Sequence, residues 1–464
     1  MVLVIDMNHC RTEADKPQDK RALLKQWLDS GEARLEPLAF PQRELWEASP
    51  VPVSDVANHI CCLIDLGGPV TAQECEAALQ QVVDRQEALR TSFLPGRERP
   101  LQMIRRKSRA NFGYMELSPA QRRDEAVEEL AKEVFAEPFE LVKGPLYRVK
   151  VFRRGMDDKV LVLAIHHAIA DGWSLGVFVQ DLCFAYVQGL LSSRQEVRPL
   201  PLGYSAWGAQ ERAFWQPSEL NRRAIFWKSK LAGHRRLWNC KEGTELESCV
   251  PERLVSCIPR DLADGAREMA RHAGVTLFSS LLTAFQIALH QWTGEDDVLV
   301  GTPVANRGSQ AVRETMGYCS GVVPIRGRID RGRSFSESLR AVHRNNLDCF
   351  ENSMPFVELA LALGESPRQG HNPIFEIRFA LQNHPVPDVA VHGLSARLKM
   401  RSTGTARFHI GCEITSIRNG FEVVWVYRSK LFSLAEIKEL GYLFQTVLAQ
   451  ACASPESRIA AISK

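Results

Sequence analysis

The sequence contains no long apolar run. In its 464 residues no stretch approaches the roughly 20 consecutive apolar residues that a membrane-spanning helix needs. Residues 1–6 are mainly apolar, but no basic segment precedes them and polar residues follow at once. This pattern does not match a secretory signal peptide. Neither a membrane span nor a signal peptide is therefore predicted.

The cysteines are scattered rather than paired. Twelve are present, Cys61 and Cys62 are adjacent, and no two form a Cys-x-x-Cys pair. Without such spacing, neither a zinc site nor a disulfide framework is expected. Free thiols in a chain of this length fit a reducing compartment. The sequence thus predicts a cytoplasmic protein that binds no metal.

Charge of one sign is not in excess. Lys and Arg number 58, Asp and Glu number 55, and the net charge is +3 with the basic residues spread along the chain. Nucleic-acid binding requires a basic patch, which this distribution does not predict. A Gly-x-Ser-x-Gly elbow, a Gly-rich phosphate loop and His-Glu-x-x-His are absent as well. We therefore expect no bound cofactor, no nucleic acid and no membrane partner.

Strand-like and helix-like segments alternate along the chain, as in an α/β protein. Apolar stretches at 60–66, 146–152 and 159–165 are typical of strands, and Thr71 followed by Glu74 predicts a capped helix. Further helices are predicted from Ser118-Pro119 through Val134, from Thr276 to Gly294 and from Ser433, and further strands at 298–301 and 421–427. With 45% hydrophobic residues, the chain is too long for one ordinary core. We expect two α/β halves with a cleft between them.

A polar, proline-containing stretch near residues 192–203 marks the expected boundary between the halves. The predicted organisation is an N-terminal extension at 1–35, a first half at 36–194 and a second half at 195–464. The extension carries a short amphipathic helix. This helix can dock on the body of the chain or on a neighbouring protein, and packing on the body is favoured.

The most informative segment follows the apolar stretch at 160–165, which leads directly into His166 and His167. It continues with Ala168, Ile169, Ala170, Asp171, Gly172, Trp173 and Ser174. Because consecutive strand residues face opposite ways, the two histidines are not expected to enter one cleft together. An imidazole near pKa 6.5 can accept a proton from an attacking amine or hydroxyl. The sequence therefore predicts one catalytic and one buried histidine.

The alternative interpretation is structural. His-x-x-x-Asp-Gly occurs often by chance, and a strand end with two structural histidines and a capping aspartate would give the same residues. The adjacent histidine, the apolar strand before it and the Trp173-Ser174 pair after it favour a functional site.

Several segments resemble, in order, the motifs of the condensation domains of nonribosomal peptide synthetases. Besides the histidine segment, which is similar to the family's His-His-x-x-x-Asp-Gly motif, they are residues 38–46, 85–93, 204–207, 300–307, 354–356 and 372–375. Residues 85–93, Arg-Gln-Glu-Ala-Leu-Arg-Thr-Ser-Phe, resemble Arg-His-Glu-x-Leu-Arg-Thr-x-Phe, and residues 301–307 match Gly-x-Pro-x-Ala-x-Arg. The resemblance extends from about residue 36 to the end.

The resemblance implies two chloramphenicol-acetyltransferase-like α/β subdomains in a V-shaped pseudodimer with a tunnel between them. Donor and acceptor carrier proteins, peptidyl or acyl, would dock on opposite faces, and each would bring its substrate on a phosphopantetheine arm. In the family the second histidine, here His167, positions or deprotonates the acceptor amine. The aspartate, here Asp171, is mainly structural and pairs with an arginine. Arg307 is the favoured partner and Arg90 the alternative.

The resemblance thus assigns roles within one segment. The predicted catalytic residues are His166, His167, Asp171 and Gly172, and the residues predicted to support them are Arg90, Trp173, Ser174 and Arg307. The implied activity is amide formation between a carrier-bound acyl or aminoacyl thioester and an amine, in nonribosomal peptide or hybrid polyketide synthesis. Two alternatives stay open: an enzyme that uses a hydroxyl or a soluble amine, and a non-catalytic platform for carrier proteins or a tailoring enzyme.

Three positions depart from the family pattern. Gln86 replaces the usual histidine of the second motif, and His409 stands where an aspartate is common. Residues 317–322 read Gly-Tyr-Cys-Ser-Gly-Val where Gly-Phe-Phe-Val-Asn-Thr is usual. These departures bear on the substrates rather than on the fold. The chain, which has no adenylation or carrier segment, is expected to act either alone or as one piece of a larger synthetase with adjacent modules.

Overall fold

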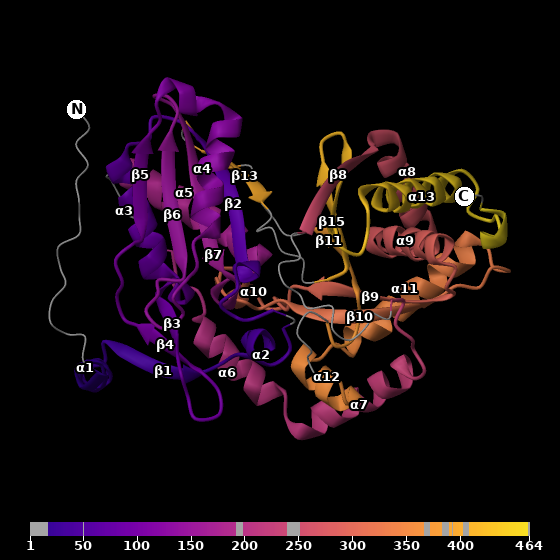
Figure 1. Cartoon of the computed structure of the whole chain (residues 1–464), viewed down its shortest axis with the longest axis horizontal. Coiled ribbons are helices and arrows are strands. Elements are labelled where there is room, and N and C mark those ends of the chain that lie inside the picture. Colours follow the sequence, from indigo (N-terminus) through magenta and orange to yellow (C-terminus); the bar gives the residue numbers. More distant parts are fainter. Residues whose placement is uncertain are drawn as a thin grey trace.

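Two six-stranded sheets, one in each half, form the frame of the protein (Figure 1). The computed structural model describes residues 17–49, 51–191, 198–238, 251–365, 372–382, 389–391, 393–401 and 408–462. The first sheet has the order β12 (Val389–Val391), β13 (Leu394–Arg401), β2 (His59–Gly67), β7 (Asp158–His166), β6 (Tyr147–Arg153) and β5 (Phe112–Glu116). The second has the order β10 (Gly321–Arg328), β9 (Asp297–Val304), β11 (Ile377–Gln382), β14 (Ile410–Ile417), β15 (Gly420–Arg428) and β8 (Pro251–Pro259). The predicted α/β class with two halves is confirmed.

A small third sheet and the helices complete the two halves. The small sheet has the order β1 (Ala33–Pro37), β4 (Leu101–Arg105) and β3 (Thr91–Leu94). The helices of the first half are α1 (Pro17–Asp29), α2 (Phe40–Glu47), α3 (Ala72–Arg85), α4 (Asp124–Ala136) and α5 (Gly172–Leu191). Those that follow are α6 (Tyr204–Phe214), α7 (Pro217–Leu231), α8 (Arg260–Ala273), α9 (Leu277–Thr293), α10 (Gln310–Arg313), α11 (Phe335–Glu351), α12 (Phe356–Leu363) and α13 (Leu434–Ala453). In the view of Figure 1 the halves stand side by side as two lobes, with α6 and α7 along the base.

Strand β7 lies at the centre of the first core. It pairs antiparallel with β2 on one side and β6 on the other, and every residue after Asp158 is buried. A strand covered on both faces needs a continuous apolar run, which is what residues 160–165 supply. The strand therefore fixes the position of the histidines at its end.

The predicted helix starts are confirmed at three places and wrong at one. Thr71, Thr276 and Ser433 each cap a helix through a side-chain oxygen. The helix predicted from Ser118 does not begin there: Pro119–Arg122 form one turn of 3₁₀ helix, and α4 begins at Asp124. Arg123 between them has φ −71° and ψ 149°, an extended conformation that a helix does not continue through.

Part of the second half belongs to the first sheet. Strand β13 pairs antiparallel with β2 over residues 395–401, and Figure 1 shows it beside β2 in the first lobe. Two ion pairs reinforce this attachment: Lys399 with Asp65 at 2.8 Å, and Arg401 with Glu128. The periodicity of residues 394–401 does not reveal this crossing, because it depends on which edge the strand meets.

The predicted domain boundaries stay predictions. The boundary at 194 lies outside the described residues, and the boundary at 35 falls within β1. The amphipathic helix of the extension is α1, which contacts β1, and Arg105 lies 4.7 Å from the centre of the Trp27 ring. Packing of this helix on the body of the chain is therefore confirmed.

We compared the helices with the length and hydrophobicity that a membrane span needs. No single helix within the described ranges is long and apolar enough to cross a membrane. Helices α8 and α9 meet that criterion as a pair, and the pair is bent by 110° at its break.

We predict that Gly301→Ala destabilises the second half by about 1–3 kcal/mol, the usual cost of an overpacked core. A Cβ at Gly301 would lie 2.0 Å from Cε2 of the buried Phe375 ring. Gly308→Ala is the matched control, because nothing lies within 4 Å of its Cβ position. Urea unfolding of both variants measures the difference, and equal stability of the two would contradict the prediction.

Candidate functional site

The two adjacent histidines have different surroundings, and His166 is the buried one. It ends β7, its exposed fraction is 0%, and its Nε2 lies 2.8 Å from the carbonyl oxygen of Val53. Its Nδ1 accepts the N–H of Ala168 at 3.1 Å. Because Nδ1 accepts, Nε2 carries the proton and donates to Val53. The His59 ring on β2, 6.0 Å away, packs beside it. His166 thus holds the start of the loop to the first half.

His167 begins a single 3₁₀ turn, His167–Ile169, and is partly exposed. Its Nδ1 lies 2.9 Å from the carbonyl oxygen of Ala170. Since a carbonyl can only accept, Nδ1 carries the proton, and Nε2 is then the basic nitrogen of the neutral ring. The ring of Tyr318 lies against the imidazole, with 4.2 Å between ring centroids and 54° between the planes.

The carboxylate of Asp171 joins the two halves. Nη2 of Arg307 lies 2.9 Å from Oδ1 and 3.1 Å from Oδ2, and the two side chains are 1% and 3% exposed. Oδ2 also accepts the main-chain N–H groups of Cys319 and Ser320, each at 3.1 Å. The predicted Asp171–Arg307 pair is therefore present, although one guanidinium nitrogen makes both contacts.

Nη1 of Arg307 is also hydrogen-bonded, whereas the buried Nε has no hydrogen-bond partner among the described residues. Nη1 donates to the carbonyl oxygens of Val312 at 2.8 Å and Thr315 at 2.5 Å. Burial lowers the pKa of Arg307, but the adjacent Asp171 carboxylate and smaller contributions from other neighbours together raise it, so that this pKa lies above its usual value. The guanidinium stays charged and keeps the buried carboxylate compensated.

The residues after Asp171 extend the contact between the halves. Gly172 begins α5, and Ser174 donates its N–H and its Oγ–H toward Oδ1 of Asp171 at 2.9 and 2.8 Å. The Ser174 hydroxyl oxygen accepts the N–H of Gly317 at 3.1 Å. Trp173 donates its indole N–H to the carbonyl oxygen of Arg313 at 2.8 Å. Trp173 and Ser174 therefore help to hold the loop that carries His167, whereas Gly172 only begins the helix.

Arg90, the alternative partner of Asp171, lies elsewhere. Its Nε donates to the carbonyl oxygen of Val83 at 3.0 Å, and its Nη1 donates to the carbonyls of Arg105 and Arg106. These contacts join the end of α3 to β4 within the first half. The favoured interpretation, with Arg307 as the partner, agrees with the structure.

A comparison of sequences identifies the family. The family model described as Condensation domain matches residues 33–463. The chain belongs to the condensation domain family. This condensation domain is 28% identical to the chondramide synthase cmdD of Chondromyces crocatus over 92% of the chain and 11% of that protein. It is 26% identical to the phosphinothricin tripeptide synthetase PhsC of Streptomyces viridochromogenes over 92% of the chain and 40% of that protein. The chain thus spans less than half of these relatives.

Solved structures show the same fold. The first condensation domain of the CDA synthetase superposes with a TM-score of 0.80 at 19% identity, covering 93% of this chain and 99% of that one. The X-domain from teicoplanin biosynthesis gives 0.79 at 19% identity, covering 92% and 97%. SgcC5 from Streptomyces globisporus gives 0.78 at 22% identity, covering 91% and 100%. The predicted pseudodimer of two chloramphenicol-acetyltransferase-like halves is therefore confirmed.

Gln86, the first departure from the family motifs, bridges the halves of this condensation domain. Its side-chain N–H₂ donates to Asp181 at 2.7 Å and to the carbonyl oxygen of Glu314 at 2.9 Å. Its side-chain oxygen accepts the N–H of Met316 at 2.9 Å. An amide can donate and accept at once without changing charge, whereas a doubly protonated imidazole can only donate. Sequence reasoning noted the substitution but did not assign Gln86 this contact.

The departure at residues 317–322 supplies the second half's side of the site through its first four residues. These residues contribute the N–H groups that bind Asp171 and the Tyr318 ring that contacts His167. Sequence reasoning missed Tyr318, although the departure itself was a signal. His409, the remaining departure, is buried in the second half beside Trp238, with 6.0 Å between the ring centroids. The main-chain N–H of His409 donates to the carbonyl oxygen of Glu376.

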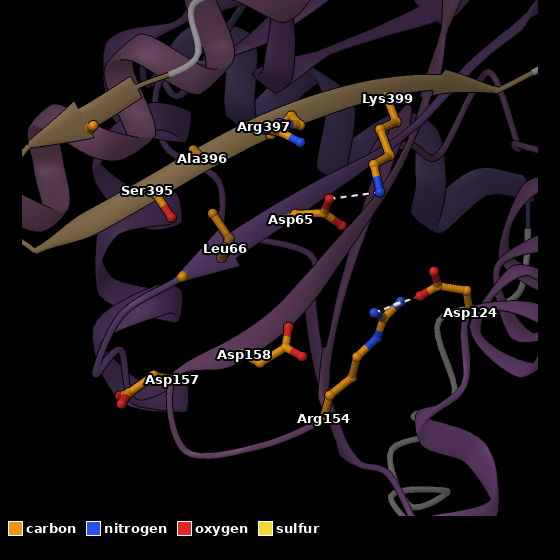
Figure 2. Close-up of a pocket in the computed structure, with 12 residues that line it drawn as sticks. Asp65, Leu66, Asp124, Arg154, Asp157, Asp158, Ser395, Ala396, Arg397 and Lys399 are labelled. Carbon is orange, nitrogen blue, oxygen red and sulfur yellow. Dashed lines mark ion pairs between the residues drawn. The ribbon is translucent and has the colours of Figure 1, made fainter.

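A separate pocket of about 500 Å³ lies over β2, β7 and β13 (Figure 2). Figure 2 shows two ion pairs in it, Lys399 with Asp65 at 2.8 Å and Arg154 with Asp124 at 2.7 Å. Asp158, at the other end of β7 from His166, also lines it. At about 3.3 Å per strand residue, roughly 26 Å separate the pocket from the histidines. The pocket is therefore distinct from the histidine loop.

Side chains that could bind a metal ion do not gather in the described part of the chain. Among the described residues, no group of three or more His, Cys, Asp or Glu side chains is placed to hold a metal ion. The nine described cysteines form no disulfide, and burial raises the pKa of several of them, such as Cys62 to about 12. The expectation that no metal or cofactor binds stays a prediction.

We predict that Asp171→Ala lowers the free energy of unfolding by about 3–5 kcal/mol, because it leaves the Arg307 charge buried and unpaired. Asp157→Ala is the matched control, since Asp157 is exposed at the other end of β7. Chemical denaturation of both variants measures the loss. An Asp171→Ala protein as stable as the control would exclude the structural role.

We also predict that His166→Ala costs more stability than His167→Ala. Removing the buried His166 ring leaves the Val53 carbonyl and the Ala168 N–H without their partners, at about 1–3 kcal/mol. His167 is partly exposed and is expected to cost less. Unfolding curves of the two variants make the comparison, and the reverse order would exchange the assigned roles.

Proposed function

We propose that this condensation domain forms an amide bond between a carrier-bound acyl or aminoacyl thioester and an amine acceptor, usually carrier-bound as well. One observation carries this proposal. The contact of His167 Nδ1 with the Ala170 carbonyl makes Nε2 the basic nitrogen, on a loop where the two halves meet. A neutral imidazole fixed in this tautomer is suited to accept or orient a proton of an attacking amine.

In the proposed reaction the amine nitrogen attacks the thioester carbonyl carbon. A C–N bond forms, the C–S bond breaks, and the proton lost by the amine leaves with the phosphopantetheine thiol. His167 accepts this proton, or holds the amine by a hydrogen bond while the proton transfers. His166, Asp171 and Arg307 act by holding the loop. The phosphopantetheine arms belong to the carriers, so this chain binds no cofactor of its own.

The partners follow from the proposed reaction. Two carrier proteins would approach a tunnel between the halves from opposite faces, and adjacent synthetase modules would supply them. Support comes from the family and from the relatives, which are named as synthases and synthetases and of which this chain matches a part. We further propose that the reaction takes place in the cytoplasm, where the free thiols of the chain would stay reduced.

Two other functions would use the same fold. A hydroxyl acceptor would give an ester, and a small soluble amine would remove the need for an acceptor carrier. A non-catalytic role is the third possibility, since the fold matches that of an X-domain solved in complex with OxyB from teicoplanin biosynthesis, with a TM-score of 0.77. His167 is present and is held by the Ala170 carbonyl oxygen and the Tyr318 ring, which favours catalysis over such a platform.

We predict that His167→Ala reduces condensation by about 10²–10⁴-fold while the fold survives, the usual loss when a general base is removed. The assay presents acyl and aminoacyl thioesters on carrier proteins, with amine and hydroxyl acceptors, and identifies products by mass spectrometry. His272→Ala is the matched control, because His272 is exposed on α8. Undiminished product from a folded His167→Ala protein would contradict the proposal.

The same assay separates the other functions. An ester product identifies the hydroxyl acceptor, and turnover with a free amine identifies the soluble acceptor. A wild-type protein that binds carrier proteins but yields no product with any acceptor indicates the platform.

A further inference from the structure

The ring that lies against His167 comes from the other half of the molecule. Tyr318 lies between α10 and β10 in the second half, and its exposed fraction is 3%. Its ring centroid is 4.2 Å from that of His167, and the planes are inclined by 54°. This separation is slightly shorter than the roughly 4.5–7 Å usual for aromatic pairs, so the two rings are in direct contact. His167 is thus contacted by its own loop and by a side chain of the opposite half.

The backbone around Tyr318 is held firmly. The Tyr204 hydroxyl donates to the Tyr318 carbonyl oxygen at 2.7 Å. The next two N–H groups, of Cys319 and Ser320, donate to Oδ2 of Asp171. On the other side, the N–H of Gly317 donates to the Ser174 hydroxyl at 3.1 Å. The backbone that carries the Tyr318 ring is therefore held in place relative to Asp171, which lies four residues after His167.

The hydrogen bond to Ala170 and the Tyr318 ring restrain the imidazole in different ways. The hydrogen bond places Nδ1 2.9 Å from the carbonyl oxygen of Ala170. The Tyr318 ring packs against the imidazole and restricts rotation of its plane. Orientation matters because a misplacement of about 1 Å at a reacting group can cost 10²-fold in rate.

We propose that Tyr318 is a positioning residue for His167: its ring, carried by the second half, holds the imidazole in one orientation. The inference rests on the proposed function in one respect, namely that His167 acts on the acceptor. It goes further in making the activity of a first-half residue depend on a side chain of the second half. The ring, not the phenol hydroxyl, is the part that acts.

The kinetic test compares Tyr318→Leu with Tyr318→Phe in the carrier-loaded condensation assay. Leucine removes the ring, and we expect kcat to fall by about 10–10²-fold while KM changes by less than about twofold. Phenylalanine keeps the ring and should restore kcat to within about threefold of wild type. Tyr442→Leu, on the exposed face of α13, is the matched control for the same exchange. Unchanged kcat in Tyr318→Leu, or no restoration by Tyr318→Phe, would overturn the inference.

A second measurement does not depend on catalysis. In a ¹H–¹³C spectrum of the histidine rings, the His167 signal is assigned by its loss in His167→Gln. We expect Tyr318→Leu to shift this signal, by removing the ring current of the tyrosine, while Tyr318→Phe leaves it near its wild-type position. An unshifted signal in Tyr318→Leu would refute the contact. A shifted signal in Tyr318→Leu, together with a wild-type protein that makes no product, would instead retain the contact and reject the proposed function.

Folding is controlled separately. If Tyr318→Leu lowers the thermal midpoint, Tyr318→Met is measured in its place, because an unbranched methionine fills irregular gaps. It lacks a ring, so the same loss of kcat and the same shift of the His167 signal are expected. Wild-type values for both quantities in a folded Tyr318→Met protein would also overturn the inference.

Discussion

A single buried carboxylate holds the site together. Asp171 receives a guanidinium from the second half, two main-chain N–H groups from the same half, and the Ser174 side chain from its own helix. An ionised carboxylate in such a place is costly unless every oxygen is compensated. Most of the compensation comes from the opposite half. The stability of this contact and the geometry of the loop that carries His167 therefore depend on each other.

The two adjacent histidines differ in what their ring nitrogens bind. His166, as the last residue of β7, uses both ring nitrogens for main-chain partners and anchors the loop. His167 uses Nδ1 for the Ala170 carbonyl, which sets its tautomer. The change from strand to 3₁₀ turn between them, rather than alternation along a regular strand, completes their separation. The result is one buried imidazole that anchors the loop and one partly exposed imidazole to which the proposed function assigns the chemistry.

The sequence allowed the class of fold, most helix caps and the Asp171–Arg307 pair to be predicted, because each follows from a local pattern or from a matched motif. It did not reveal that Ser118 caps a single 3₁₀ turn, since Pro119 suits both kinds of helix start. The contacts of Gln86 and Tyr318 could not be predicted either. Both depend on how two halves of the molecule meet in space, and no periodicity of the sequence encodes that placement.

The attachment of β13 to β2 has a consequence for dividing the molecule. The first half, taken alone up to residue 194, would lack β12 and β13 and would expose the edge of β2, whose N–H and C=O groups now pair with β13. An isolated fragment of this kind would be prone to edge-to-edge aggregation. A chimera of two related condensation domains that replaces the second half therefore also replaces one edge of the first sheet. Such a chimera must preserve the β2–β13 pairing as well as the contact between Asp171 and Arg307.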